Sequence, residues 1–275
     1  MISDLRICVI GAGKMGEALI HSLISKNAIV HNELFAADVL KDRCEYISRR
    51  YKVECSTDIV KTAHKCNIII IAVKPKDVLP LAEIISKFVT AKQLIVSLVA
   101  GVSSDSLSRV LGGNIPVIRV MPNIAVLVSE GMIALARGPN STDEHMALAK
   151  RLFSYTGRVA IVDEKQMDAV TALSGSGPAY IYTVIEAMSD GGVKVGLQKE
   201  LAIILAAQTA LGAAKMILET NEHPAKLRDM VMTPGGTTVE GILQLERGNV
   251  RASLMEAIIK ATDKSSELRK SQETS

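Results

Sequence analysis

The sequence lacks the features of a nucleic-acid-binding or disulfide-stabilised protein. Among 275 residues there is no tryptophan, aromatic residues make up 3%, and the formal net charge is only +3. A chain without a basic surface or aromatic stacking platforms does not favour nucleic acid as a partner. The four cysteines form no Cys-x-x-Cys pair and no cluster with histidines. We therefore expect buried free thiols, with no metal site and no disulfide.

The chain also lacks a clear secretion signal or membrane anchor. A strand is predicted within a few residues of the N-terminus, which leaves no space for a cleaved signal and favours a cytoplasmic protein. Residues 201–218 are apolar nearly all round, but Gln208, Thr209 and Lys215 lie among them, and a membrane span needs about 20 apolar residues. Helices that are apolar on all sides are usually buried in protein. We predict that this segment forms the core of a homodimer interface, with a membrane span as the alternative.

Hydrophobic residues make up 48% of the chain, which allows a substantial core. In the first half, short apolar runs alternate with amphipathic stretches, and this alternation predicts a doubly wound sheet of the α/β class. Strands are predicted at 6–10, 34–38, 68–73, 94–98, 117–121, 131–136 and 158–162. Helices are predicted between them at 16–26, 42–51, 58–65, 76–88, 104–111 and 142–153.

The character of the sequence changes after about residue 162, beyond which no strand is predicted. Helices are predicted there at 165–189, 199–219, 224–232, 237–244 and 250–270. We therefore predict two domains, an α/β domain over residues 1–163 and an all-α domain over residues 164–275.

The most informative stretch is the glycine motif at residues 11–16. An apolar strand runs directly into Gly11, Gly13 and Gly16, and a helical pattern follows at once. This strand, turn and helix start is the element that holds the pyrophosphate of a dinucleotide in Rossmann-type domains. Gly11 makes the turn, Gly13 lets the backbone approach the phosphates, and Gly16 lets the helix pack close to the strand, while free N–H groups face the anion. A glycine-rich turn without a ligand is the alternative.

Asp38 closes the second predicted strand, 27 residues after Gly11. An acidic side chain at this place commonly binds the adenosine ribose hydroxyls and repels a 2′-phosphate, which favours NADH over NADPH. Lys41 and Arg43 follow closely and offer positive charge to a phosphate instead. A third interpretation is that Asp38 only caps the next helix.

Further candidate residues stand at the ends of later strands. Ligands of open α/β sheets bind outside the carboxyl ends of the strands. Lys74, between Val73 and Pro75, is placed to reach phosphate or ribose oxygens, and the small residues around Ala100 leave space for a nicotinamide ring. Asn123 follows the strand at 117–121 and is expected to face the cleft. Together these strand ends predict that the cofactor binds along the carboxyl edge of the sheet.

Two glycine-rich stretches interrupt the helical second half. Residues 173–180 contain Pro178, which fits the first turn of a helix or else removes a hydrogen bond inside one. Close packing of small residues against another helix is the alternative there. Residues 232–240 predict a loop that opens a helix, whose N–H groups and hydroxyls form an anion pocket suited to a carboxylate. A simple helix cap is the alternative for this loop.

These motifs resemble those of a known enzyme family, pyrroline-5-carboxylate reductase. The resemblance runs from about residue 5 to residue 270 and is carried by residues 11–16, 72–75, 172–180, 190–193 and 233–238. It implies reduction of 1-pyrroline-5-carboxylate to L-proline, the last step of proline biosynthesis, with NADPH or NADH. It also implies a Rossmann-type domain followed by a helical domain that forms a homodimer, often within a larger homo-oligomer.

Site residues follow from the resemblance together with the strand-end and helix-start arguments. The cofactor is expected against Gly11, Ala12, Gly13, Lys14, Met15, Gly16, Asp38, Val73, Lys74, Pro75 and Ala100. The substrate is expected against Glu164, Gly235, Gly236, Thr237 and Thr238. The chain departs from the family pattern at Ile124–Ala125, where the family usually has Thr-Pro, and at Ile59, where an Asn often contacts adenosine. NADP-preferring members tend to have Ser at the position of Asp38, in agreement with a preference for NADH.

The residues favour a mechanism without a strong catalytic acid. A cyclic imine protonated at nitrogen is already an electrophile, so hydride transfer mainly requires alignment. We expect the Thr238 hydroxyl to accept a hydrogen bond from the iminium nitrogen. A β-hydroxyacid dehydrogenase is the nearest alternative enzyme, but it needs a helix Lys as base, and the chain offers Tyr180, Tyr182 and Glu186. A non-catalytic nucleotide-sensing dimer is the alternative of another class.

Overall fold

The computed structural model describes residues 5–273 of the chain, and side chains as far as residue 271. By its contacts the chain divides into two compact units. One contains the residues up to Ser176 together with those from Lys260 onward, and the other is Gly177–Ile259. These units are defined by contacts alone, so the domain limits of 1–163 and 164–275 stay a prediction.

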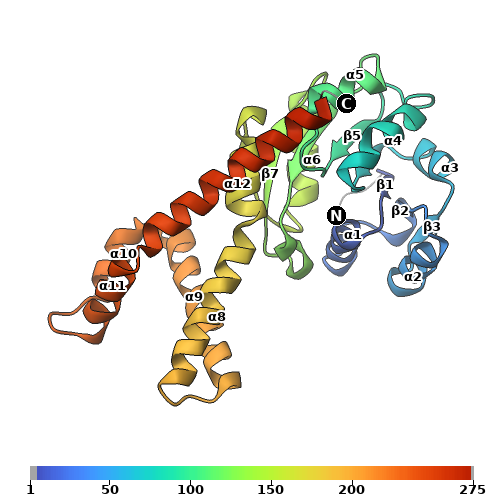
Figure 1. Cartoon of the computed structure of the whole chain (residues 1–275). Helices are drawn as coiled ribbons and strands as arrows, with labels where there is room; N and C mark the ends of the chain where they lie inside the picture. The colour runs from blue at the N-terminus through green and yellow to red at the C-terminus, as the bar shows by residue number, and fades with distance from the viewer. Residues whose placement is uncertain (1–4, 274–275) are drawn as a thin grey trace. The chain divides into compact units, whose positions relative to one another are not determined.

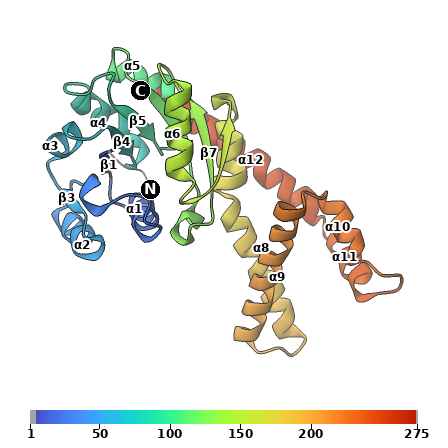
Figure 2. The ribbon, with the colours of Figure 1, turned by 180° about the vertical axis from the view of Figure 1, so that it is seen from behind.

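The first unit contains a sheet in the order β3-β2-β1-β4-β5-β6-β7-β8, seen from opposite sides in Figures 1 and 2. Its strands are β1 Ile7–Ile10, β2 Leu34–Ala37, β3 Glu54–Ser56, β4 Ile68–Ile71, β5 Leu94–Ser97, β6 Val117–Met121, β7 Gly131–Arg137 and β8 Gly157–Val162. The strand order reverses between β1 and β4, and in open α/β sheets this is the point where ligands bind. The predicted doubly wound Rossmann-type fold is therefore confirmed.

Helices cover both faces of the sheet, and alternate residues of each central strand pack on opposite sides. In β4, Ile68 and Ile70 pack with α1, α2 and α6, whereas Ile69 and Ile71 pack with α3, α4 and α5. A strand buried on both faces must be apolar throughout, which is why β4 reads as an unbroken run of isoleucine. These helices are α1 Lys14–Ser25, α2 Lys41–Tyr51, α3 Ile59–His64, α4 Val78–Ile85, α5 Ser104–Leu111 and α6 Asp143–Phe153.

Two features of the sheet were not predicted. The edge strand β3 is three residues long and only half-buried, so it lacks the apolar run that marks the other strands. β7 runs antiparallel to β6, while all other neighbouring strands are parallel. The link between β6 and β7 contains only a short 3-10 turn, Ile124–Val128, and a parallel crossover needs a dozen or more residues.

The predicted burial of the cysteines is confirmed for three of the four, all of which are free thiols. Cys8, Cys44 and Cys66 are buried, and Cys55 on the edge strand is partly buried.

The helix predicted at 165–189 is wrong as a single element. After a 3-10 turn at Glu164–Gln166, α7 Met167–Val170 continues into a π-helical turn at Thr171–Gly175, and α8 starts only at Gly177. The Ser176 N–H donates to the Thr171 carbonyl five residues back, at 2.8 Å, which makes the wider turn. Pro178 then lies in the first turn of α8, where its missing N–H costs no helical hydrogen bond.

The second unit consists of helices, as predicted. They are α8 Gly177–Lys194, α9 Lys199–Thr220, α10 Pro224–Met230, α11 Thr237–Arg247 and the first part of α12 Val250–Glu273. α8 and α9 lie side by side as a hairpin in both ribbon views. At their contact a Cβ on Gly192 would lie 3.2 Å from the Ala202 side chain, so a small residue allows the close approach.

Candidate active site

The glycine loop between β1 and α1 has the geometry that a phosphate-binding turn requires. Gly11 has a φ of +94°, and a Cβ there would lie 2.7 Å from the Ala72 carbonyl oxygen. A Cβ on Gly16 would collide with the Gly11 carbonyl oxygen. Gly13 is different, because a Cβ there would meet nothing within 4 Å. Gly11 and Gly16 are therefore required by the fold itself, whereas the protein alone gives no steric reason for Gly13.

Asp38 ties the glycine loop to the end of β2. Its Oδ2 accepts a hydrogen bond from the Ala12 N–H at 2.8 Å, and its Oδ1 accepts one from the Leu40 N–H at 3.0 Å. The N-cap of α2 is Leu40, with no side-chain cap hydrogen bond, so Asp38 contacts the residue before the helix and does not cap it. The Ala12 contact was not predicted. An ionised carboxylate offers about four acceptor sites, so Asp38 retains capacity for ribose hydroxyls.

Arg43, considered above as a phosphate ligand, is already engaged. Its Nε donates to the Ala12 carbonyl, and its guanidinium pairs with the Glu17 carboxylate of α1. The Tyr51 hydroxyl donates to the same carboxylate at 2.7 Å. Lys41 is 82% exposed and lies 3.8 Å from Glu45. Lys41 and Arg43 therefore each have an acidic neighbour in the protein.

An apolar cavity of about 280 Å³ opens beside the glycine loop, at the carboxyl ends of β1 and β2. Its lining residues are Ile10, Gly11, Ala37, Asp38, Val39, Ile59, Val73, Asp77, Pro80, Leu81 and Ile84. A flat slot with aliphatic walls and a carboxylate at its edge suits the adenosine part of a dinucleotide. Ile59 forms part of this apolar wall.

Seven lining residues were missed: Ile10, Ala37 and Val39 at the strand ends, and Asp77, Pro80, Leu81 and Ile84, which follow β4. For the last four, the available signal was their position, because they follow the strand end at Lys74 within three helical turns.

Lys74 itself is exposed and precedes the 3-10 turn Pro75–Asp77. Ala100 follows β5 and precedes Gly101, whose φ is +77°. The structure thus brings the predicted cofactor residues together along one edge of the sheet.

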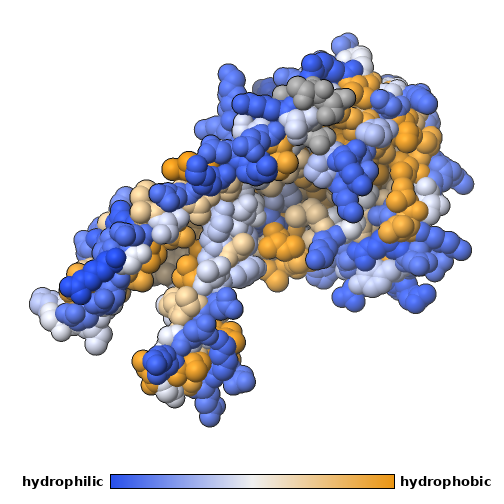
Figure 3. Space-filling view, viewed as in Figure 1, coloured by the Kyte–Doolittle hydropathy of each residue, from blue (hydrophilic) through white to orange (hydrophobic). Residues whose placement is uncertain are grey.

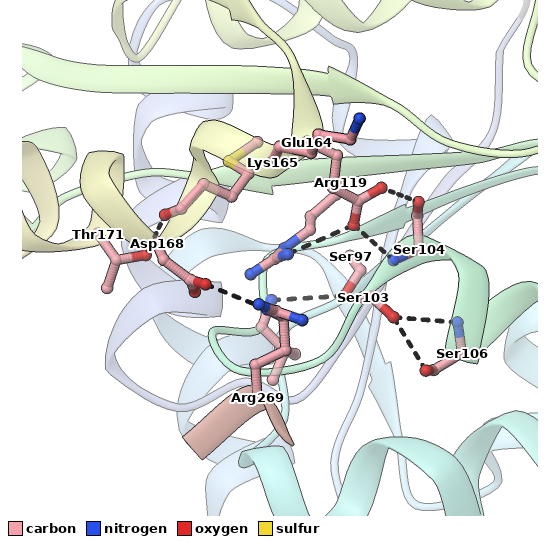
Figure 4. Close-up of polar contacts among 12 residues, drawn as sticks. Ser97, Ser103, Ser104, Ser106, Arg119, Glu164, Lys165, Asp168, Thr171 and Arg269 are labelled. Atoms are coloured by element: carbon pink, nitrogen blue, oxygen red, sulfur yellow. Dashed lines mark hydrogen bonds and ion pairs between the residues drawn. The ribbon is translucent and has the colours of Figure 1, made fainter. Parts of the chain in front are cut away.

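Glu164, predicted to contact substrate, lies in a partly buried polar cluster of the first unit (Figure 4). Its Oε1 accepts from the Ser104 N–H at 2.7 Å and from Arg119 Nη1 at 3.3 Å, and its Oε2 accepts from the Ser104 hydroxyl. Arg119 is only 2% exposed. Glu164 therefore neutralises a buried arginine and occupies the N-terminus of α5.

A neighbouring pair belongs to the same region. Asp168 of α7 accepts from the Ser265 hydroxyl at 2.8 Å and from Arg269 Nε at 3.1 Å. These bonds attach the last turns of α12 to the sheet domain. Both clusters line a polar hollow of about 740 Å³, whose charged residues are of both signs.

The replacement Glu164→Gln is expected to lower the free energy of unfolding by about 3 kcal/mol, because breaking one side of a buried ion pair leaves an uncompensated charge. The measurement is thermal or denaturant unfolding. The matched control is Glu83→Gln, at an exposed position of α4, which should leave the midpoint unchanged. An unchanged midpoint for Glu164→Gln would contradict a structural role.

The predicted substrate loop lies in the helical unit and starts α11. Gly235 has a φ of +69°, and the Gly236 N–H donates to the Thr233 carbonyl at 2.9 Å. Thr237 and Thr238 are the first two residues of α11, and Gly236 at the N-cap makes no side-chain cap hydrogen bond. The N–H groups of the first helical turn and the two hydroxyls therefore gather at one helix start, the arrangement that binds a carboxylate.

Comparison with known proteins gives the family. Residues 164–268 match the family model described as pyrroline-5-carboxylate reductase dimerisation, and residues 6–101 match one described as NADP oxidoreductase, coenzyme F420-dependent. Pyrroline-5-carboxylate reductase of Methanosarcina acetivorans is 43% identical over 98% of this chain and 100% of its own length. The chain belongs to the pyrroline-5-carboxylate reductase family. The Escherichia coli relative of the same name is 35% identical, over 98% of this chain and all of its own length.

Solved structures agree with this assignment. The pyrroline-5-carboxylate reductase of Coxiella burnetii superposes with a TM-score of 0.90 at 32% identity, covering 96% of this chain and 98% of that one. The Plasmodium falciparum pyrroline carboxylate reductase, solved with NADP bound, has a TM-score of 0.88 at 29% identity, covering 98% and 100%. The predicted family, its fold class and its place among nucleotide-dependent oxidoreductases are confirmed.

Proposed function

We propose that this protein reduces 1-pyrroline-5-carboxylate to L-proline with NADH or NADPH, the last step of proline biosynthesis. The match over the whole chain to reductases of that name carries the proposal. The glycine loop, the apolar slot beside Asp38 and the helix start at Thr237 supply the features that the reaction needs. No Lys stands in the Gly177–Lys194 helix before its last residue, which disfavours a β-hydroxyacid dehydrogenase.

The mechanism depends on positioning. When bound, the reduced nicotinamide supplies a hydride. The glycine loop and Lys74 hold the phosphates and ribose, and Ala100 leaves room for the ring. The start of α11, from Gly235 to Thr238, binds the substrate carboxylate, because its N–H groups carry partial positive charge. The Thr238 hydroxyl accepts a hydrogen bond from the protonated imine nitrogen and orients the C=N carbon toward the hydride. A substrate contact by Glu164 stays a prediction.

Asp38 favours NADH as the reductant. Its carboxylate is fixed by two backbone N–H groups at the edge of the apolar slot, where ribose hydroxyls donate well and a 2′-phosphate meets like charge. Cofactor preference is therefore expected to lie with NADH, although the family as a whole uses both nucleotides.

One assay tests the activity against its alternatives. The protein is incubated with pyrroline-5-carboxylate and either NADH or NADPH, and both nucleotide oxidation and proline formation are followed. We expect turnover with both nucleotides and a higher kcat/KM with NADH. Nucleotide binding without turnover would favour a sensor, and turnover only with 3-hydroxyacids and NAD would favour the dehydrogenase.

We further propose a homodimer formed through the C-terminal helices, with larger homo-oligomers as a further step. Exposed apolar side chains lie along α9, among them Leu201, Ile204 and Leu211, and Figure 3 shows hydrophobic residues at the surface of the helical unit. Among the described helices, α9 is the one long and apolar enough to cross a membrane, and only 11% of its apolar window is buried. The match of residues 164–268 to a dimerisation family model supports a second copy of this chain as the partner that covers this surface. Sedimentation of a monomer at micromolar concentration would contradict the proposal; the cytoplasmic location stays a prediction.

A further inference from the structure

We propose that Glu17, in the first turn of α1, is a second determinant of nucleotide selectivity, because it neutralises the arginine that stands beside Asp38. The inference rests on the proposed use of NADH or NADPH. It assigns to Glu17 a role at the 2′ position of the adenosine ribose, although the residue lies outside the glycines that hold the pyrophosphate.

The contacts form a chain of hydrogen bonds that passes through the backbone of Ala12. Ala12 donates its N–H to Asp38 at 2.8 Å and accepts a hydrogen bond at its carbonyl from Arg43. Arg43 in turn pairs with Glu17, and Glu17 also accepts from the Tyr51 hydroxyl at 2.7 Å. The guanidinium of Arg43 is therefore held at the glycine loop, and Ala12 contacts both this group and the Asp38 carboxylate.

Packing restricts the Arg43 side chain further. Its guanidinium carbon lies 4.8 Å from the centre of the Tyr46 ring, in a cation–π contact. Its side chain is 26% exposed and that of Glu17 is 20% exposed. A partly buried ion pair is screened less by salt than a surface pair, so its charges act on a bound ligand.

Glu17 is ionised in the folded protein. Burial alone raises the pKa of its carboxyl, but hydrogen bonds from Arg43, Tyr51 and Tyr46 outweigh burial and hold the pKa below its ordinary value. Asp38 and Glu17 each contribute one negative charge and Arg43 one positive charge, and Arg50 adds a second positive charge nearby, because its Nε donates to the Tyr51 hydroxyl at 3.1 Å. Lys41 adds nothing to this sum, because Glu45 lies beside it.

This charge balance decides which nucleotide is accepted. A ribose hydroxyl is neutral and donates to Asp38, whereas a 2′-phosphate brings about two negative charges next to the Asp38 carboxylate. Without Glu17, Arg43 loses the carboxylate with which it pairs, five residues along the chain from Asp38. An arginine with a free planar fork is the side chain best suited to bind phosphate. Glu17 thus prevents Arg43 from serving NADPH.

The test compares Glu17→Gln, Asp38→Ser and the double variant. Dissociation constants for NADH and NADPH are measured by fluorescence titration without substrate, and kcat/KM is measured beside them. Each single variant should shift the NADPH-to-NADH ratio toward NADPH by about tenfold, as expected for removing one charge near a partly screened dianion. The double variant should exceed the product of the two shifts, because only then is Arg43 released from Glu17 while no carboxylate at position 38 repels the phosphate that it binds. Adding Arg43→Met to the double variant should remove that excess.

The matched control is Tyr51→Phe, which removes one hydrogen bond to Glu17 but no charge, and it should leave the ratio unchanged. If Glu17→Gln does not fold, Glu17→Met is the second neutral variant. Equal weakening of both nucleotides by Glu17→Gln would overturn the inference and leave only a structural role. Because binding is measured without substrate, a protein that shows the shift but reduces no pyrroline-5-carboxylate would overturn the proposed function alone.

Discussion

The replacement Gly16→Ala should both destabilise the protein and weaken nucleotide binding. The added methyl group would collide with the Gly11 carbonyl oxygen, a backbone atom that cannot rotate away, and would lie 3.2 Å from the Val9 side chain. Overpacking of this kind costs about 1–3 kcal/mol. Since α1 must move away from β1, its N–H groups also leave the position that binds phosphate. Affinity for NADH should fall at least about tenfold, the equivalent of 1.4 kcal/mol.

Gly13→Ala separates fold from binding. Gly13 has an ordinary negative φ of −67°, and its added methyl group meets no protein atom within 4 Å. The thermal midpoint should therefore remain that of the unchanged protein, while NADH affinity falls because the methyl group occupies space needed by the pyrophosphate. Unfolding curves and fluorescence titration of all three proteins check both statements. Full affinity in Gly13→Ala would show that the phosphates do not approach this residue.

Thr238→Ala should lower turnover far more than it changes cofactor affinity. A hydrogen bond that involves a charged group contributes about 1.5–3 kcal/mol, which corresponds to a loss of about ten- to a hundredfold in kcat/KM. Thr238 is the second residue of α11, so its methyl and hydroxyl groups are displayed at a helix start and contribute little to the core. Stability is therefore expected to change little.

The conservative replacement Thr238→Ser provides the control, because it keeps the hydroxyl and removes only a methyl group. It should restore most of the turnover lost in Thr238→Ala, whereas NADH dissociation constants should stay alike in all three proteins. Steady-state kinetics with saturating NADH measures the difference. Equal turnover in Thr238→Ala and the unchanged protein would remove the hydroxyl from the mechanism.

Prediction of the elements succeeded where the pattern is local and strong. The strand at 117–121 and the helix at 104–111 agree with the structure at both ends. The three-residue strand β3 was not predicted because it is an edge strand without an apolar run. The division of the helix at 165–189 escaped notice because a π-helical turn differs from an α-helix by a single hydrogen-bond step, which side-chain periodicity does not record.

Prediction of the site was uneven for a related reason. The glycine loop was recognised, because glycine spacing reports backbone geometry directly, and the structure shows why Gly11 and Gly16 admit no side chain. Arg43 was left open as a phosphate ligand, and its pairing with Glu17 was not foreseen. The substrate contact of Glu164 stays a prediction, and the contacts of its two oxygens with Ser104 and Arg119 were not foreseen.

Most strands and helices, the dinucleotide-binding turn and the membership of a reductase family followed from the chain as written, because apolar periodicity and glycine spacing act over a few neighbouring residues. Folding in three dimensions decided the antiparallel direction of β7, the walls of the apolar cavity beside Asp38 and the partners of Asp38, Arg43 and Glu164. Glu17 and Arg43 are 26 positions apart, and Glu164 and Ser104 are 60 apart. No local pattern records which of many long polar side chains will meet once the sheet has closed and desolvation makes each buried charge seek a partner.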